Sequence, residues 1–409
     1  MHRSRPNRVT TLHGIGVDKM GDIADKQKSN QPKSSDSQKH EKLLRLENLD
    51  VDIPPDPIVA QTTSAAAISD DDNSYLPFLG QLELRNAVAA HVSSMTTGIV
   101  EYTGEKNCII SAGGLSGILN VLLATVEDGD GVLLMEPVYA GLLNRVRLAG
   151  GVPVLVPFSF HAGQSWTLDL ERLREAVESS ESNITTMVLM SPSMPTGAYL
   201  HERDWALIAE LCVKYDILLI LDAAMERLLF DGLPVIHPAG LPGMAERTIT
   251  IGSASKELRM IGWRVGWIVG PEQIMQDVAL VSMANVVVPV GITQKAAKVA
   301  LERSKTTLQE YVNELQFRRD LVMEELSGLP FGKPDGGWSM LLRVDTMNWT
   351  ADNAAEALLK AGLCVTPMMG WGTNDEAQYI RIVYSNEPRE RLNGLGVKVR
   401  QALLGEDRV

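Results

Sequence analysis

Lys256 and its neighbours form the group of residues in this sequence with the clearest chemical use. Ser253 and Ser255 precede the lysine, and Arg264 follows it between two glycines. A lysine amine becomes a covalent catalyst when it forms a Schiff base with a carbonyl. Serine hydroxyls and an arginine guanidinium offer the hydrogen bonds and the charge that suit a phosphate. A ligand with both a carbonyl and a phosphate is therefore indicated, and pyridoxal phosphate (PLP) is such a ligand.

The alternative interpretation of Lys256 is a solvated surface lysine that happens to follow a strand. Residues 247–252 read as a buried strand, and short motifs of this kind often match by chance. The choice depends on whether other suitable side chains come at the ends of neighbouring strands.

Strand-like and helix-like segments alternate between about residues 105 and 270. The predicted strands are 108–111, 131–135, 152–156, 186–190, 217–221, 248–251 and 265–269, and helices are expected at about 114–126, 168–177 and 205–215. Continuous apolar strands that alternate with helices indicate an α/β fold, with a mostly parallel sheet covered on both faces. Ligands of such sheets bind beyond the carboxyl ends of the strands.

Two candidates follow strands of this sheet. Asp222 ends one strand, where its carboxylate could hold a protonated pyridine nitrogen, or could cap the next helix. Gly113, Gly114 and Leu115 lie between a strand and a helix. Their backbone N–H groups at a helix N-terminus would cradle a phosphate, and the alternative is an ordinary tight turn.

Two further side chains have a functional and a structural interpretation. Tyr139 follows another strand and could stack on a flat ring, or could be a core tyrosine. Arg381 lies in the middle of an apolar strand, where a buried arginine needs a partner. That partner is a bound carboxylate or a structural ion pair.

Taken together, these residues resemble the fold-type I, class I/II aminotransferase family of PLP enzymes, from about Leu43 to the C-terminus. The resemblance implies a Schiff base between Lys256 and PLP, a large PLP-binding domain and a smaller α+β domain. It implies that Asp222 pairs with the pyridine nitrogen and that Arg381 binds the substrate carboxylate. Ring and phosphate contacts would come from Tyr75 of a partner subunit and from Gly113, Gly114, Leu115, Tyr139, Ser253, Ser255 and Arg264. A homodimer with shared sites follows.

Two positions depart from the family pattern. The family's N-P-x-N-P-T-G segment is here Ser191 to Gly197 with Met194 at the second asparagine, and its D-x-x-Y segment has Met225 at the tyrosine. In relatives, both residues donate a hydrogen bond to the phenolic oxygen of the cofactor, whereas methionine sulfur is at most a weak acceptor. We expect the linkage at Lys256 to hold its proton more tightly, unless another residue or water supplies the bond.

Aminotransfer from an α-amino acid to a keto acid is the leading function. The alternative is a PLP-dependent lyase or synthase that eliminates or replaces a β or γ substituent. Aminocyclopropane-carboxylate-synthase-like enzymes are the example, with S-adenosylmethionine as a candidate substrate. Oxidase-like chemistry and a PLP-sensing transcription regulator are weaker options. Trp338, Trp371 and Met368 line the substrate pocket or belong to the core of the small domain.

The order of segments predicts four parts. Residues 1–42 are polar and read as a flexible extension, 43–75 as an arm, 76–310 as the large domain and 311–409 as the small domain. Residues 272–325 look helical, and strands at 338–342 and 379–383 flank a helix at 351–361.

Composition excludes several classes of protein. The net charge is −13, which argues against nucleic acid or an anionic membrane as the main partner, and no apolar run approaches the length of a membrane span. Cys108, Cys212 and Cys364 are too far apart for a zinc site or a disulfide framework, so we expect no metal. The expected compartment is the cytoplasm.

Overall fold

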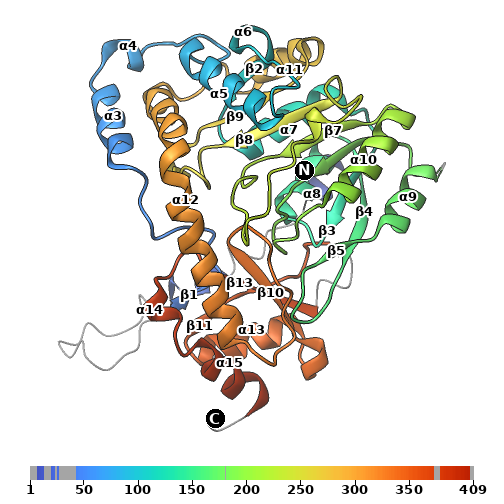
Figure 1. Cartoon of the computed structure of the whole chain (residues 1–409), viewed down its shortest axis with the longest axis vertical. Coiled ribbons are helices and arrows are strands. Elements are labelled where there is room, and N and C mark those ends of the chain that lie inside the picture. Colours follow the sequence, from blue (N-terminus) through green and yellow to red (C-terminus); the bar gives the residue numbers. More distant parts are fainter. Residues whose placement is uncertain are drawn as a thin grey trace, which may run out of the picture.

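The computed structural model describes residues 7–12, 20–23, 25–26, 43–179, 181–372 and 378–405. A large sheet with its helices forms one part of the molecule, and a smaller group of strands and helices forms the other (Figure 1). The long helix α12 (Gln294–Glu325) runs along both parts.

The large sheet has the strand order β2-β9-β8-β7-β6-β3-β4-β5. Its strands are β2 (Cys108–Ser111), β3 (Gly131–Glu136), β4 (Val152–Ser159), β5 (Thr167–Leu168), β6 (Ile184–Leu189), β7 (Leu218–Asp222), β8 (Thr248–Ser253) and β9 (Gly266–Val269). Neighbours from β8 through β4 pair in parallel, whereas β9 is antiparallel to both β8 and β2. The sequence predicted seven strands for this sheet, and the two-residue strand β5 is an eighth, antiparallel to β4 at the edge.

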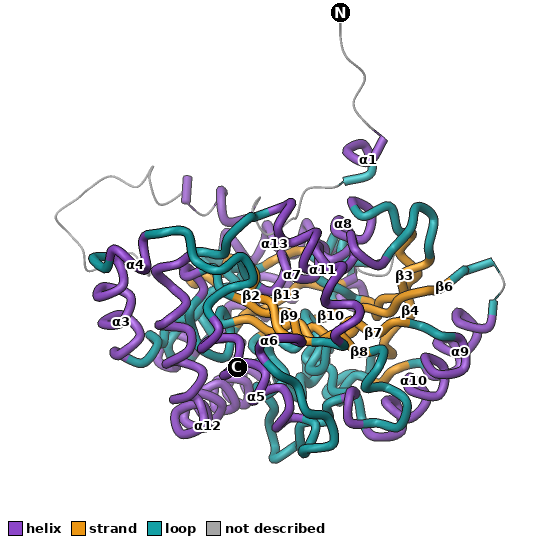
Figure 2. The backbone as a smooth tube through the Cα atoms, turned by 90° about the horizontal axis from the view of Figure 1, so that it is seen from above, coloured by secondary structure: helices purple, strands orange, loops and turns teal. Residues whose placement is uncertain are grey.

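Alternate side chains of each central strand enter different cores. In β3, Val132 and Leu134 pack with helices α7 (Gly114–Thr125), α8 (Ala140–Leu148) and α11 (Glu272–Asn285). Leu133 and Met135 face the other way, toward α9 (Leu170–Glu178) and α10 (Glu202–Tyr215). The tube view shows these two helix layers on either side of the strands (Figure 2). Both faces of the sheet are therefore buried, as the continuous apolar runs predict.

Helix α5 (Leu82–Met95) and the first turns of α12 cover the β2 and β9 end of the sheet in a third apolar cluster. The remaining helices of this part are α3 (Pro57–Ala67), α4 (Asp70–Asn73) and α6 (Gly104–Asn107). Helix α8 was not predicted, and Leu168, expected to open a helix, belongs to strand β5.

The smaller part has a three-stranded antiparallel sheet of β10 (Ser339–Arg343), β13 (Tyr379–Val383) and β12 (Thr366–Pro367). Strand β1 (Leu44–Arg45) pairs in parallel with β11 (Leu363–Cys364). Helices α13 (Ala351–Lys360), α14 (Arg389–Leu392) and α15 (Leu395–Leu404) complete it. Because α12 crosses from one part to the other, the division at residue 311 stays a prediction.

Most of the predicted flexible extension lies outside the described residues. The described pieces include α1 (Asn7–Thr10) and the helical residues 20–23. Met20 is buried and its carbonyl accepts a hydrogen bond from Cys364, while Asp25 pairs with Arg45. Residues around 20–25 therefore pack onto the smaller part of the fold, whereas α1 lies against α8 of the larger part; the sequence predicted neither contact.

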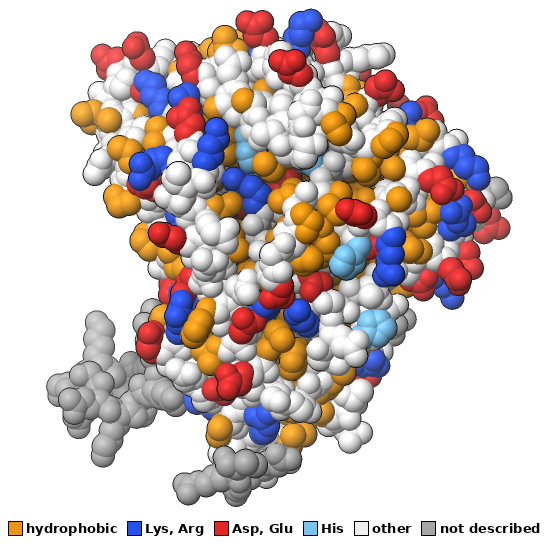
Figure 3. Space-filling model, viewed as in Figure 1, with side chains coloured by type: hydrophobic (Ala, Val, Ile, Leu, Met, Phe, Trp, Pro, Cys, Tyr) orange, Lys and Arg blue, Asp and Glu red, His pale blue; other side chains and the backbone are white. Residues whose placement is uncertain are grey.

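Side chains of both charges are interspersed over the described residues on the face shown in Figure 3. Within the described part of the chain, no helix is long and apolar enough to cross a membrane.

Candidate active site

A cavity of about 240 Å³ lies at the carboxyl ends of the central strands. It is lined by Leu49, Gly114, Leu115, Tyr139, Met190, Met194, Asp222, Ala224, Ser253, Ser255, Lys256, Ile261, Arg264 and Trp338. Nine of the thirteen predicted site residues are in this set. The exceptions are Tyr75, Gly113, Met225 and Arg381, and each has a distinct position.

The turn between β2 and α7 forms an anion cradle with Arg264. Gly113 has φ 91° and is the N-cap of α7, so the first N–H groups of that helix point out of its end. A Cβ atom on Gly113 would lie 2.6 Å from Nη2 of Arg264, so a larger residue there would displace the guanidinium. Arg264 has a left-handed backbone, and its Nη1 donates to the Ile261 carbonyl at 2.9 Å. A helix N-terminus and a guanidinium thus meet at one end of the cavity, where an anion would be stabilised.

Asp222 is the last residue of β7 and is buried in the cavity wall. Its Oδ1 accepts a hydrogen bond from the backbone N–H of Ala224 at 3.1 Å, so it caps a turn, and no helix begins there. Burial raises the pKa of Asp222, while that hydrogen bond and the charges of Lys256 and Arg145 act in the opposite direction. A cation placed next to this carboxylate would favour its ionised form.

Lys256 follows β8, with its amine enclosed by apolar groups. Its Nζ lies 4.0 Å from the ring centre of Trp338 and 3.8 Å from Sδ of Met194. Burial lowers the pKa of Lys256 to about 8, assisted by the positive charge of Arg381 and opposed by Asp222. The interpretation of Lys256 as a solvated surface residue is therefore wrong, because its side chain lies inside the cavity.

Tyr139 lies at the start of α8, in the cavity wall. Its ring meets that of Trp371 edge to face, with 5.4 Å between the ring centres. Gly141 allows this position, since a Cβ there would lie 2.4 Å from Cε1 of the tyrosine. The tyrosine is half-buried and presents part of its surface to the cavity.

Arg381 lies behind Trp371, in the middle of β13, with no exposed surface. Its Nη2 donates to the carbonyl of Glu47 at 2.9 Å and to Oγ1 of Thr366 at 3.0 Å. Its Nε and Nη1 have no hydrogen-bond partner among the described residues, and those residues place no carboxylate in an ion pair with it. Burial lowers the pKa of Arg381 to about 9. The structural ion pair is thus not formed within the described chain, and two donors of this fully buried guanidinium have no partner there.

The two methionines occupy different positions. Met194 lines the cavity beside Lys256. Met225 is buried, and its Cε lies 3.5 Å from where a Cβ of Gly337 would be, so its side chain packs beneath the Trp338 segment. Tyr75 is 87% exposed and does not reach the cavity of its own chain. The predicted cofactor contacts of Met225 and Tyr75 stay predictions.

Sequence reasoning missed four lining residues: Leu49, Met190, Ala224 and Ile261. Ala224 and Ile261 could have been predicted because they lie close in sequence to Asp222 and Lys256. Nothing in the local sequence around Leu49 indicates that it reaches the cavity. Three residues had been assigned either to the substrate pocket or to the core of the small domain. Trp338 lines the cavity, whereas Trp371 and Met368 are buried in the hydrophobic core.

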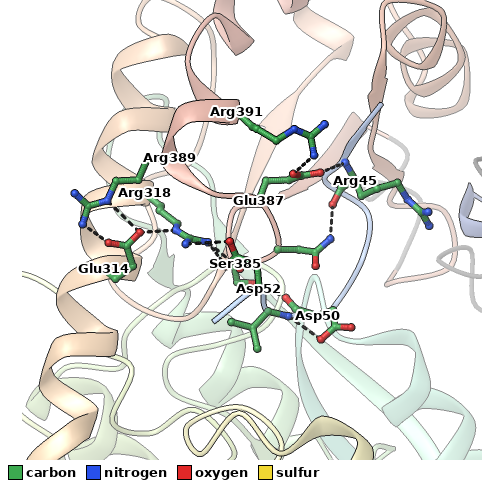
Figure 4. Close-up of polar contacts among 11 residues, drawn as sticks. Arg45, Asp50, Asp52, Glu314, Arg318, Ser385, Glu387, Arg389 and Arg391 are labelled. Atoms are coloured by element: carbon green, nitrogen blue, oxygen red, sulfur yellow. Dashed lines mark hydrogen bonds and ion pairs between the residues drawn. The ribbon is translucent and has the colours of Figure 1, made fainter. Parts of the chain in front are cut away.

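Leu49 reaches the cavity because the arm before α3 is fastened to the smaller part (Figure 4). Nη1 of Arg318 donates to Oδ1 of Asp52 at 2.7 Å and to the Ser385 carbonyl at 3.0 Å. The hydroxyl of Ser385 donates to the Asp50 carbonyl at 2.6 Å. These contacts fix the arm on both sides of the point where it meets the cavity.

A lysine, a carboxylate and an anion cradle thus lie together at the carboxyl ends of the strands of a parallel sheet. Residues 44–395 match the family model described as aminotransferase class I and II. The chain belongs to this family of PLP-dependent transferases, which confirms the predicted family and its fold type.

Individual relatives agree with this assignment. The chain is 32% identical over 316 residues to an aspartate aminotransferase of Pyrococcus abyssi, with 76% of this chain and 79% of the relative covered. It is also 32% identical over 320 residues to aromatic-amino-acid aminotransferase 2 of Thermococcus litoralis, with 76% and 79% covered. The solved structure of N-succinyldiaminopimelate aminotransferase from Mycobacterium tuberculosis superimposes with a TM-score of 0.86 at 26% identity, over 97% of this chain and 100% of that one.

Proposed function

We propose that this protein transfers the amino group of an α-amino acid to a keto acid, with PLP held through Lys256. The observation that carries the proposal is the cavity itself. It brings the amine of Lys256, the carboxylate of Asp222 and the Arg264 cradle to one space, and Arg381 lies behind its wall with two free donors.

The donor set fits PLP group by group. The N-terminal N–H groups of α7, Ser253, Ser255 and Arg264 would hold the phosphate, and Asp222 would accept the proton of the pyridine nitrogen. Tyr139 would lie against the ring. When bound, PLP supplies a carbonyl for an amine and a ring that draws electrons from the substrate α-carbon.

Lys256 serves as nucleophile and as proton carrier in this proposal. With a pKa of about 8, a useful fraction of the amine is neutral near pH 7.5, unlike an exposed lysine. Its Nζ can therefore take a proton from the substrate α-carbon and return it elsewhere. The ring of Trp338 and the side chain of Met194 keep water from that nitrogen.

Arg381 would bind the substrate α-carboxylate with Nε and Nη1. Two parallel hydrogen bonds from one guanidinium match a carboxylate, and the contacts of Nη2 with Glu47 and Thr366 fix the orientation of the group. Satisfying the two free donors would stabilise a site that otherwise contains a buried and incompletely paired cation.

A second candidate is elimination or replacement at the β or γ carbon, including aminocyclopropane-carboxylate-synthase-like chemistry on S-adenosylmethionine. The observation in its favour is Met194, a weak sulfur acceptor at the position where the family has an asparagine donor.

One experiment tests both candidates. The PLP-loaded protein is mixed with a panel of amino acids while cofactor absorbance and products are followed. Conversion to the pyridoxamine form that a keto acid reverses supports aminotransfer. Release of ammonia, a thiol or methylthioadenosine supports the second candidate. Lys256→Ala should abolish the covalent linkage to the cofactor and so change its visible spectrum, and an unchanged spectrum would overturn the assignment of Lys256.

A homodimer with shared sites is part of the proposal. Tyr75, Phe78, Val287 and Val290 are exposed, and the hydrogen bond between Gln81 and Gln294 joins their two segments at 2.8 Å. The proposal places this apolar surface, with residues 285–291, against a second copy, so that Tyr75 reaches the partner's phosphate. Sedimentation at several concentrations tests it: a monomer throughout would contradict a shared site.

A further inference from the structure

A buried ion pair joins the turns that follow the two groups proposed to hold the cofactor. Glu257 immediately follows Lys256, and Arg227 lies in the turn that follows Asp222. The side chain of Glu257 is 6% exposed and that of Arg227 13%. Neither lines the cavity, so neither has been assigned a role above.

Both carboxylate oxygens of Glu257 bind Arg227. Oε1 of Glu257 accepts the backbone N–H of Arg227 at 2.8 Å, and Oε2 accepts Nε at 2.8 Å. Nη1 of Arg227 donates to Oγ of Ser304 at 3.1 Å, and that hydroxyl donates to the Leu301 carbonyl of α12. Both carboxylate oxygens are therefore used, and the arginine connects the turn after β7 with the turn after β8 and with α12.

The same turn also holds Trp338. One residue beyond Arg227, the Leu228 carbonyl accepts the N–H of Gly337 at 2.8 Å, and Phe230 donates to the Asp335 carbonyl at 2.9 Å. Gly337 precedes Trp338, whose ring covers Nζ of Lys256. The turn held by the Glu257–Arg227 pair is thus connected both to Asp222 and to the aromatic cover of the lysine.

We propose that the Glu257–Arg227 pair positions the cofactor-binding site, by fixing the Lys256 turn relative to Asp222 and Trp338. The inference rests on the proposed function, since Lys256 and Asp222 are the groups that would hold opposite sides of one PLP ring. A buried charge pair suits this role because its geometry is specific, even where its net contribution to folding stability is small. Both residues are positioning residues, without contact to the substrate.

The test compares Glu257→Gln, Arg227→Gln and Arg227→Lys with a matched control in the full-length, PLP-loaded protein. The control is Arg391→Met, which breaks an ion pair with Glu387, a side chain that is 4% exposed, in the smaller part of the fold. Arg391 also donates to the Leu43 carbonyl and is not among the residues that line the cavity. Three quantities are measured for each variant: thermal midpoint, half-time of PLP release after dilution, and kcat and KM of the amino-acid half-reaction.

A positioning role predicts that Glu257→Gln and Arg227→Gln each release PLP about tenfold faster and lower kcat about tenfold, with little change in KM, because misplacement of reacting groups by a fraction of an ångström has effects of this size. Arg227→Lys should recover part of the loss. Arg391→Met should lower the thermal midpoint and leave PLP release unchanged.

One outcome would contradict the positioning role alone, and another would contradict the proposed function on which it rests. If the Glu257 and Arg227 variants lose thermal stability like the control but release PLP at the unsubstituted rate, the pair is merely structural. If the unsubstituted protein binds no PLP, the proposed function fails first.

Discussion

The ring of Trp338 lies 4.0 Å from Nζ of Lys256, so the amine of this lysine rests on an aromatic face. The ring has two opposing effects on the amine. Its electron-rich face attracts a positive charge, whereas its bulk keeps water away. The pKa of Lys256 falls to about 8, which means that exclusion of water dominates.

This balance predicts a stability effect of Lys256 in the cofactor-free protein. The folded pKa of about 8 lies below the ordinary value of 10.5, so the unfolded chain binds more protons between those values and stability rises with pH in that window. Lys256→Met should therefore stabilise the cofactor-free protein at pH 7 by up to about 3 kcal/mol, since a pKa unit corresponds to roughly 1.4 kcal/mol. The advantage should shrink above pH 8 and disappear near pH 10.5. Urea unfolding of both proteins at pH 7 and pH 10.5 measures it, and an advantage that does not depend on pH would contradict the explanation.

The free donors of Arg381 predict a substitution that raises KM. Arg381→Lys keeps the charge and loses the planar pair of N–H groups, so KM for the amino acid should rise at least about tenfold. Steady-state kinetics measures the change, and Arg400→Lys, on α15 outside the cavity, is the control. Equal KM values for Arg381→Lys and the unsubstituted protein would exclude Arg381 as the carboxylate receptor.

Met194 and Met225 are expected to respond differently to restoration of the family residues. Met194 faces Lys256, so Met194→Asn would add a donor within the cavity and should lower the pH midpoint of the visible absorbance of the PLP-loaded enzyme. Met225 packs beneath Gly337, so Met225→Tyr would overfill a buried space and should destabilise by about 1–3 kcal/mol. Spectral titration and thermal unfolding measure the two effects. A midpoint that does not move in Met194→Asn would mean that another group already stabilises the oxygen.

Substitution of Gly113 by alanine should reduce the affinity for PLP. An alanine there must adopt φ 91° and would lie 2.6 Å from Arg264, so the guanidinium has to move. Gly113→Ala should weaken PLP binding about tenfold or more, as measured by titration with PLP. Gly98→Ala is the control, since that glycine also has positive φ but nothing near its Cβ position. Equal losses in the two variants would point to backbone strain alone.

The ion pair between Arg318 and Asp52, which fastens the arm, predicts that a substitution outside the cavity changes substrate binding. Arg318→Met removes the contacts that fasten the arm, and hydrogen bonds to charged groups of this kind contribute about 2 kcal/mol. The free energy of unfolding should therefore fall by about that amount. KM for the amino acid should also rise, because the arm supplies Leu49 to the cavity and the Glu47 carbonyl to Arg381. Calorimetry and kinetics check the two expectations; a loss of stability with unchanged KM would show that the arm stays in place without this ion pair.

The central strands and several site residues were predictable because they follow local rules. A strand buried on both faces is a short apolar run, and Asp222 and Lys256 come at or just after the ends of such runs. The turn that begins α7 was recognisable from its glycines for the same reason.

The rest depended on contacts between distant segments. Leu49 enters the cavity only because Arg318 and Ser385 hold the arm, and nothing in the local sequence of the arm encodes those partners. Whether Trp338 was pocket or core could not be decided from its apolar neighbours. Helix α8 was missed because its short sequence contains a glycine and weak helical periodicity, and packing against the sheet stabilises it.

The arm also has a consequence for the order in which the protein can be assembled on the ribosome. The backbone N–H of Arg45 binds Glu387, 342 residues away in the chain, and β1 completes its pairing only with β11. The first segments of the smaller part must therefore wait, unpaired, until nearly the whole polypeptide has been translated. The large sheet, complete by residue 269, has all of its strands well before that point. Arg381 and the arm whose Glu47 carbonyl it binds are thus among the last segments of the fold to come together.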